Sequence, residues 1–170
     1  MQEIVGYPLD NFSLNLRDIV DLIYFEGPLL TLFENEYGDS YLYYWCDVDE
    51  QCNRWLVFRV TRKTLRFYVT QKLSLRELIV NPVDGFLYSI ELDDELQCQR
   101  CCLIQPPNLP PKYIPAVDSY YDFSKLDPEE TEAKGLLLEK IWDEKHELSD
   151  LLTKLFDKPP LEMIDEPSLA

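Results

Sequence analysis

The sequence predicts an α+β fold. A mostly antiparallel sheet, built from a meander (28–61) and a hairpin (86–104), is covered by short helices and followed by a C-terminal helical arm. Two observations carry this prediction: β-branched and aromatic runs separated by polar turns, and a helix start at Asp127-Pro128 after a proline-rich stretch. We therefore divide the chain into an α+β domain (1–104), a proline-rich connector (105–126), an acidic helical arm (127–158) and a tail (159–170).

Length and charge narrow the classes of partner. A chain of 170 residues can fold as one domain with an appendage. Its net charge of −16 repels phosphate backbones and anionic lipid heads. We therefore expect no membrane binding, regard nucleic acid as an unfavourable ligand, and expect a protein partner or a second copy in a homodimer. The simpler interpretation is that the acidity only keeps the protein soluble.

The cysteines indicate a reducing compartment. There are five, an odd number, in a chain that starts without the basic and apolar regions of a secretory signal. We expect reduced thiols and a cytoplasmic protein. No uncharged apolar run approaches the ~18 residues that a membrane span needs.

The first elements are a lead-in and a helix. Residues 1–12 mix glycine, proline and aromatics and predict irregular structure. From Ser13 onward, apolar residues follow a helical spacing that ends at Gly27-Pro28, which predicts a short amphipathic helix over the meander. The apolar positions are Leu16, Ile19, Val20 and Ile23.

The meander has turns near 37–40 and 49–53. If Val48 pairs with Arg54, then Tyr44 lies opposite Phe58, and Leu42, Tyr44, Cys46, Leu56, Phe58 and Val60 form a core face. In that register Tyr43 faces Arg59. The other face is also aromatic, so it needs a cover or a partner. We take it as the candidate interaction face, formed by Tyr41, Tyr43, Trp45, Trp55 and Arg59.

Helices and a second hairpin follow the meander. Residues 62–69 fit both a strand and a helix, and we favour the helix. Ser74 and Glu77 form a capping box before a short helix that Asn81-Pro82 ends. Alternating apolar residues from Phe86 then predict two strands joined at 93–95.

The remainder is a connector, an arm and a tail. Five prolines between 106 and 115 exclude a helix and a central strand, which favours an extended connector held by its aromatics. A polyproline ligand for another protein is the alternative. From Asp127 a helical stripe continues for about 29 residues, roughly 43 Å. Gly135 and the polar run 143–147 offer points where it would split into two helices.

No metal, cofactor or catalytic residue is assigned. Cys98-x2-Cys101-Cys102 is half of a zinc site, but alternation places Cys98 and Cys102 on one strand face and Cys101 on the other, so free thiols are favoured. Asp47 and Asp49 resemble a calcium loop whose register fails, with Cys52 at the glycine position. The single His146 lies among charged residues, and no phosphate loop or nucleophile elbow is present.

Basic residues cluster after the meander. Arg59, Arg62, Lys63 and Arg66 form a candidate anion patch beside the aromatic face. The alternative is that these side chains pair with the protein's own carboxylates.

One long pattern resembles a known family. Residues 24–61 read YFEGPLLTLFENEYGDSYLYYWCDVDEQCNRWLVFRVT, and LSLRELI and DGFLYSIEL follow. Over roughly Ile23 to Leu92 the chain resembles an uncharacterised family of small bacterial proteins, a domain of unknown function found often in cyanobacteria. The resemblance implies a bacterial, cytosolic protein and supplies no activity or site residue.

Together these features favour a non-catalytic interaction module that acts through the aromatic sheet face and the C-terminal helix. Two alternatives stay open. One is a small enzyme that uses the carboxylates near Asp47 and Asp49 with the arginine patch. The other is an acidic mimic that occupies a nucleic-acid-binding surface.

Overall fold

A computed structural model describes residues 1–122. Met1–Tyr121 form one compact unit, and Asp122–Ala170 are grouped as a second. The predicted helical arm (127–158), the tail (159–170) and the end of the connector therefore lie outside the described residues.

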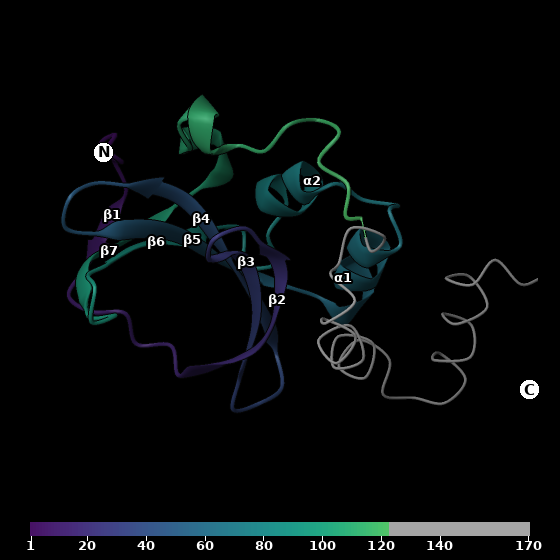
Figure 1. The fold of residues 1–170 in the computed structure, drawn as a ribbon, viewed down its shortest axis with the longest axis horizontal. Helices are drawn as coiled ribbons and strands as arrows, with labels where there is room; N and C mark the ends of the chain where they lie inside the picture. Colours follow the sequence, from purple (N-terminus) through teal and green to yellow (C-terminus); the bar gives the residue numbers. More distant parts are fainter. Residues whose placement is uncertain (123–170) are drawn as a thin grey trace, which may run out of the picture. The chain divides into compact units, whose positions relative to one another are not determined.

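The described unit is built on a seven-stranded sheet with strand order β1-β7-β6-β5-β4-β3-β2 (Figure 1). Every pair of neighbouring strands is antiparallel. The predicted antiparallel sheet with a few short helices is therefore confirmed. Its strands are β1 (Tyr7–Leu9), β2 (Leu16–Tyr24), β3 (Pro28–Asn35), β4 (Ser40–Val48), β5 (Asn53–Val60), β6 (Leu87–Leu92) and β7 (Cys98–Ile104).

The helix expected after Ser13 is wrong, because that stretch forms β2. Val20 and Leu22 are buried at alternating positions, and three register shifts in the β2–β3 pairing obscure the period of two. Long-range pairing with β3 therefore outweighs the local helical spacing. The lead-in is not wholly irregular either, since Tyr7–Leu9 form β1 at the edge beside β7.

The meander has the predicted strands and turns but a different register. Tyr41 pairs with Arg59, Tyr43 with Val57, and Trp45 with Trp55, so each pair is two residues away from the expected one. Half of this difference arises at the turn, where Val48 pairs with Asn53 and not with Arg54, and the other half from a bulge between Trp45 and Asp47 that adds one residue to β4. Because the shift is even, the residues assigned to each face are unchanged.

The two predicted helices are present. Helix α1 (Arg62–Val69) is capped by Thr61, and helix α2 (Leu75–Val80) by Ser74 in the expected capping box with Glu77. The statement that the prolines exclude any helix is wrong. Two short 3-10 helices, η1 (Pro106–Asn108) and η2 (Pro111–Tyr113), form there because proline is tolerated in the first turn.

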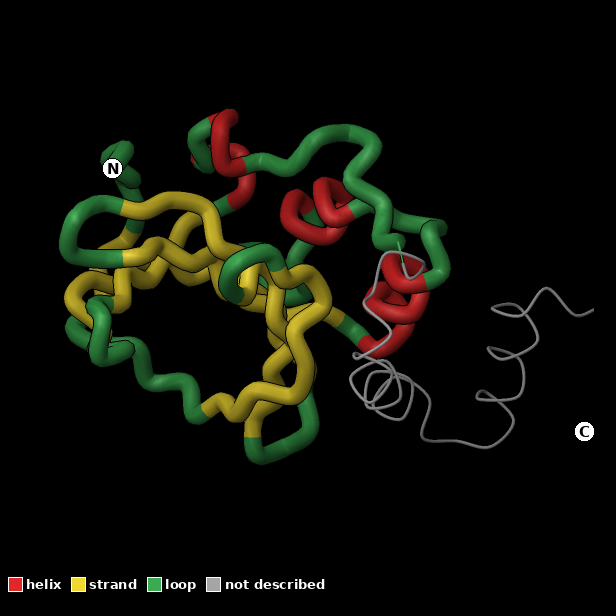
Figure 2. The backbone as a smooth tube through the Cα atoms, viewed as in Figure 1, coloured by secondary structure: helices red, strands yellow, loops and turns green. Residues whose placement is uncertain are grey.

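The sheet is strongly curved and has a core on each face. On its outer side lie α1 and α2 (Figure 1). Four fully buried leucines share one face of β3, β4 and β5: Leu30, Leu32, Leu42 and Leu56. On its inner side the strap, which we define as residues 10–15, crosses from β1 at one edge to β2 at the other (Figure 2). None of the described helices is long and apolar enough to cross a membrane.

Candidate interaction surface

The aromatic face proposed for interaction lies on the inner side of the curved sheet. Tyr41 is 6% exposed, and Tyr43, Trp45 and Trp55 are half-buried. Phe33 stacks on Tyr43 at 4.1 Å between ring centroids, and Tyr43 lies 6.2 Å from Trp55. Tyr41, Tyr43 and Trp55 pack as part of a second core, to which Trp45 does not belong.

The strap covers this inner core. Phe12 makes edge-on contacts with Tyr43, at 6.4 Å between centroids, and with Tyr88, at 5.2 Å. Leu14 packs against the same cluster. Burial raises the pKa of the Tyr43 hydroxyl, in keeping with a position shielded from water. Residues from the same chain therefore occupy much of the face that the sequence left without a cover.

Arg59, the fifth residue of that face, is engaged by the protein's own carboxylates. Its Nη2 donates to Asp84 Oδ1 at 2.6 Å, and its Nη1 lies 3.9 Å from Asp39 Oδ1. The hydrogen bond to Asp84 is the main cause that raises the pKa of Arg59. For this residue the structure follows the alternative of internal pairing.

The other members of the candidate anion patch lie on α1. Arg62 and Arg66 are four residues apart on this helix, and Lys63 Nζ lies 5.9 Å from the centroid of the Phe67 ring. The strand β5 runs from Asn53 to Val60, so α1 begins at the opposite end of that strand from the β4–β5 turn. The carboxylates near Asp47 and Asp49 are therefore not brought together with this patch.

A buried polar network joins the sheet to the N-terminus and to η2. Arg54 is 3% exposed; it donates to Glu91 and to the Tyr113 hydroxyl, both at 2.8 Å, and to the Gln2 carbonyl. The Tyr113 hydroxyl in turn donates to Asp47. Sequence reasoning missed this network, although an arginine at a core-facing strand position was a signal that it needs partners.

The groups around Asp47 keep its side chain in the ionised carboxylate form. Burial alone would raise the pKa of this carboxyl, but hydrogen bonds from the Tyr113 hydroxyl and from the Val48 and Gln2 backbone amides outweigh it and lower the pKa. Lys112 Nζ adds an ion pair at 3.2 Å. Burial and the bond to Asp47 raise the pKa of Tyr113 to about 12. Both groups thus keep one protonation state near neutral pH, which suits a structural role better than proton transfer.

The cysteines are all free thiols. Cys101 is buried, Cys98 is exposed, and Cys46, Cys52 and Cys102 are half-buried. The expected faces are wrong, because a bulge between Cys98 and Arg100 places Cys98 opposite Leu92 and Cys101 opposite Ile90, on the same side. Among residues 1–122, no three His, Cys, Asp or Glu side chains gather as a metal site would require.

Both edges of the sheet carry features that oppose strand addition. At one edge, β1 is three residues long and contains Pro8, which lacks an amide hydrogen. At the other edge, β2 is bulged and exposes the charged side chains of Arg17 and Asp18. A partner that adds a β-strand to this sheet is therefore disfavoured.

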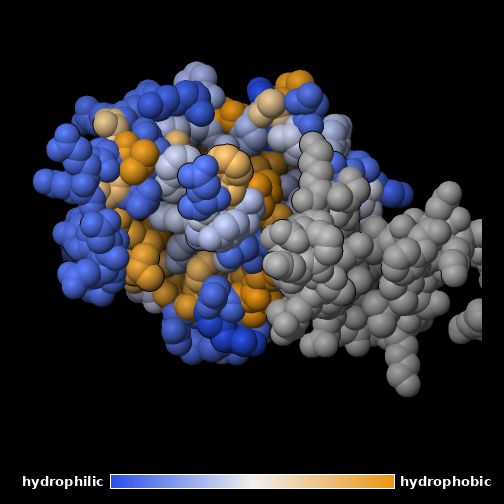
Figure 3. Space-filling view, viewed as in Figure 1, coloured by the Kyte–Doolittle hydropathy of each residue, from blue (hydrophilic) through white to orange (hydrophobic). Residues whose placement is uncertain are grey.

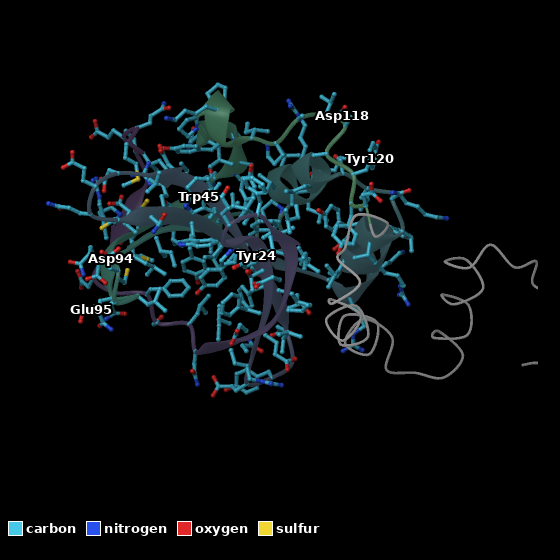
Figure 4. All side chains as sticks on the ribbon, viewed as in Figure 1. Tyr24, Trp45, Asp94, Glu95, Asp118 and Tyr120 are labelled. Carbon is cyan, nitrogen blue, oxygen red and sulfur yellow. The ribbon has the colours of Figure 1, made fainter. Side chains whose placement is uncertain are left out.

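The most exposed aromatic pair lies at the tip of the β2–β3 hairpin. Tyr24 is 57% exposed and Phe25 is 71% exposed. Glu26 and Gly27 complete the turn with positive φ angles of 55° and 146°. Tyr24 is labelled in Figure 4. Sequence reasoning missed this pair because it placed the residues at the end of a helix, although adjacent aromatics before Glu-Gly-Pro are typical of a turn.

Two further turns share this end of the sheet, because alternate turns of an antiparallel meander lie on the same side. Residues 49–52 join β4 to β5, and residues 93–97 join β6 to β7, where Asp94 and Glu95 are labelled in Figure 4. Hydrophilic residues dominate the left side of Figure 3, where these two turns lie. We define the hairpin end as residues 24–27, 49–52 and 93–97. It carries six carboxylates and no Lys or Arg: Glu26, Asp49, Glu50, Asp93, Asp94 and Glu95.

Comparison with known proteins identifies one family. The family described as "Family of unknown function (DUF6575)" matches residues 8–113, which is more than half of the chain. No curated protein and no solved structure matches the chain. The resemblance to a family of unknown function is therefore confirmed, while the bacterial origin that it implied stays a prediction.

Proposed function

The chain belongs to the DUF6575 family, and we propose that it is a non-catalytic interaction module that binds a basic protein partner through its hairpin end. The observation that carries this proposal is the exposed pair Tyr24 and Phe25 at an end of the sheet whose turns bear carboxylates and no cation.

The aromatic pair supplies the apolar part of such a surface. Aromatic side chains bury about 150–250 Å² each when covered, and they dominate the energy of many protein interfaces. Tyr24 and Phe25 stand at the end of a hairpin, away from the inner core that holds the other aromatics. Large apolar side chains that are exposed next to each other are unfavourable in water, and such patches mark sites where a partner covers them.

The backbone of the tip supports a fixed presentation. Glu26 adopts a left-handed conformation (φ 55°), which is uncommon for a residue other than glycine. The Phe25 amide donates to the Gly27 carbonyl at 2.9 Å, which closes the turn. A tip held in one conformation loses less entropy on binding than a mobile loop. Backbone conformations of this kind also concentrate at functional sites.

The charge of the hairpin end defines the partner. Six carboxylates without a cation create a negative potential that attracts Lys and Arg and speeds encounter with a basic surface. The same field repels nucleic acid and anionic lipid, which leaves a basic protein as the favoured ligand.

A catalytic role has less support than binding. Asp47 is tied to Tyr113, Lys112 and the Gln2 amide, and Asp49 accepts hydrogen bonds from the Gln51 and Cys52 amides. Hydrogen bonds from these two amides lower the pKa of Asp49. Neither carboxylate faces the basic residues of α1 that the enzyme alternative requires.

The test uses fluorescence anisotropy with the full-length protein. One labelled synthetic peptide combines Lys and Arg with Leu, and a second has the same apolar residues with Glu in place of the basic ones. We expect saturable binding of the basic peptide only. The combined substitution Tyr24→Ser and Phe25→Ser should weaken it at least about tenfold, as the loss of interface hot spots does.

The matched control is Tyr37→Ser, which removes an aromatic that is 83% exposed at the opposite end of the sheet. It should leave affinity unchanged. If the double variant binds the basic peptide as tightly as the original protein does, only diffuse electrostatics is at work and the proposed docking surface is wrong.

A further inference from the structure

A groove of about 420 Å³ lies at the β1 edge of the sheet, and its lining begins directly after the 93–97 turn of the hairpin end. Residues from the N-terminal segment line one side, and the first half of β7 lines the other. Because β1 pairs only with Cys101–Leu103, the preceding residues of β7 have no neighbouring strand on this side. Cys98 and Cys101 both border the groove, and Cys98 is the one of the two that is exposed.

The bulge in β7 brings these two thiols together. In a regular strand, residues three apart point to opposite faces. Here Cys98 and Cys101 pair with Leu92 and Ile90, which are two residues apart on β6 and share a face. Their side chains therefore project to the same side of the sheet as near neighbours.

The Cys98 side chain is held close to Cys101. The Cys98 thiol donates to the Arg100 carbonyl oxygen at 3.4 Å, and Arg100 is the residue directly before Cys101. Cys98 is exposed whereas Cys101 is 4% exposed. One thiol is thus placed to meet an oxidant and the other to resolve the adduct.

We propose that Cys98 and Cys101 are a site of reversible oxidation that closes to a disulfide within β7. With glutathione disulfide as oxidant, the Cys98 thiolate attacks one sulfur of that disulfide, forms a mixed disulfide and releases one glutathione thiolate. The Cys101 thiolate then attacks the Cys98 sulfur and releases the second glutathione. Two protein thiols are oxidised to one disulfide, one glutathione disulfide is reduced to two thiols, and the two protons lost by the protein thiols end, by way of solvent, on the two glutathione sulfurs.

None of the other three cysteines is placed to form a disulfide with Cys98 or Cys101. Cys102 pairs with Ser89 and points to the opposite face of β7 from Cys101. Cys52 lies in the β4–β5 turn and Cys46 lies on β4, so neither belongs to β7. The exchange should therefore stop at one pair and leave three free thiols of the five.

The reaction should be slow at neutral pH and accelerate in base. Burial is the largest cause that raises the pKa of both thiols, to about 12 for Cys101. Since only the thiolate attacks a disulfide, the rate should increase about tenfold per pH unit below the thiol pKa. A thiol pair that reacts this slowly responds to a sustained change in redox conditions and does not suit the rapid cycles of a catalytic disulfide.

The test incubates the full-length folded protein with excess glutathione disulfide at several pH values, alkylates the remaining thiols, and maps the peptides by mass spectrometry. We expect an internal Cys98–Cys101 linkage that dithiothreitol reverses. In Cys101→Ser, glutathione should instead stay attached to Cys98. In Cys98→Ser, the loss of thiols should slow at least about tenfold.

Cys52→Ser is the matched control and should form the linkage at the original rate. The inference is overturned if glutathione remains on Cys98 in the unaltered protein, if Cys98 pairs with another cysteine, or if linkage needs denaturant. Circular dichroism in the near ultraviolet verifies that each variant is folded.

Discussion

Arg54 illustrates how one charged side chain organises a packed region. It is buried on the outer face of the sheet and bonds to β6, to η2 and to the N-terminal segment. Its Nε is buried with no hydrogen-bond partner among residues 1–122, so the network is not fully satisfied. Such a network stabilises the fold only while its other members remain in place.

Removing Arg54 should therefore be costly. Arg54→Leu leaves Glu91 and Tyr113 without their main partner, and we expect the free energy of unfolding to fall by about 3 kcal/mol in urea titration. Lys112→Ala breaks only the more exposed ion pair to Asp47 and should cost less than about 1 kcal/mol. Equal effects of the two substitutions would contradict a buried network centred on Arg54.

Asp47 gives the network a pH dependence of known sign. Its pKa is lowered in the folded state, so its contribution to stability is present above the unfolded pKa of about 4 and is lost as the pH falls through the folded value. Tyr113→Phe removes one of the bonds that lower this pKa. We expect it to destabilise the protein by about 1 kcal/mol at neutral pH, and by less once the pH falls through the lowered pKa of Asp47. Urea titrations at a series of pH values test this, and a difference that grows in acid would contradict it.

Gly6 is required by a close approach of two backbone segments. A Cβ atom there would lie 2.4 Å from the Leu103 carbonyl oxygen and 3.0 Å from Cys102 Sγ. Gly6→Ala should therefore displace β1 and lower the free energy of unfolding by about 1–3 kcal/mol in urea. Val5→Ala, at a side chain that is 81% exposed, should change it by less than about 0.5 kcal/mol. If Gly6→Ala has the same free energy of unfolding as Val5→Ala, the two backbone segments can move apart without loss of stability, which contradicts this prediction.

At the scale of elements, the strap determines whether the inner aromatic face is available. Sequence alone indicated two apolar faces on the meander, and the structure contains both. What the sequence did not indicate is that residues 10–15, in which Phe12 and Leu14 alternate with exposed polar residues, would cross one of them. Such alternation shows that one side of a segment is covered, but the position of the segment is set by the elements that it joins.

Phe12 should be the main apolar contact of the strap. Phe12→Ala removes a ring packed on Tyr43 and Tyr88, and we expect a loss of about 3 kcal/mol in the free energy of unfolding, with increased binding of an apolar dye. Ser13→Ala, which alters an exposed neighbour, is the control. Unchanged stability and dye binding would mean that the strap does not close the inner face.

Bulges are the second reason why the sequence did not predict the elements fully, because they change the strand register. The alternation in β4 and β5 was enough to assign faces, and the capping box followed by Asn81-Pro82 was enough to place α2. Helix α1 was favoured from a pattern that also fits a strand. A bulge adds one residue without any obvious mark in the sequence, so the β4–β5 register and the side on which Cys98 lies were both wrong. The helix expected for β2 failed for a related reason, since its register shifts mimic a helical spacing.

At the scale of the whole described unit, charge is segregated along the sheet. The hairpin end carries six carboxylates, whereas the segment of α1 and α2 carries Arg62, Lys63, Arg66, Lys72 and Arg76 with Glu77 as the one acid. The net charge alone predicted a basic partner but not where it would bind. That position required the topology, because only the strand order shows that these three turns, far apart in sequence, lie at the same end of the strands.

The proposed surface is tested most directly by cross-linking from defined positions. A photoreactive phenylalanine analogue is placed at Phe25 in the full-length protein, irradiated in the cells that naturally make it, and compared with the same analogue at Tyr37. We expect a discrete protein adduct from position 25, attached beside Lys or Arg residues of the partner, and none from position 37. No adduct from position 25, or the same adducts from both positions, would contradict a partner-binding hairpin end.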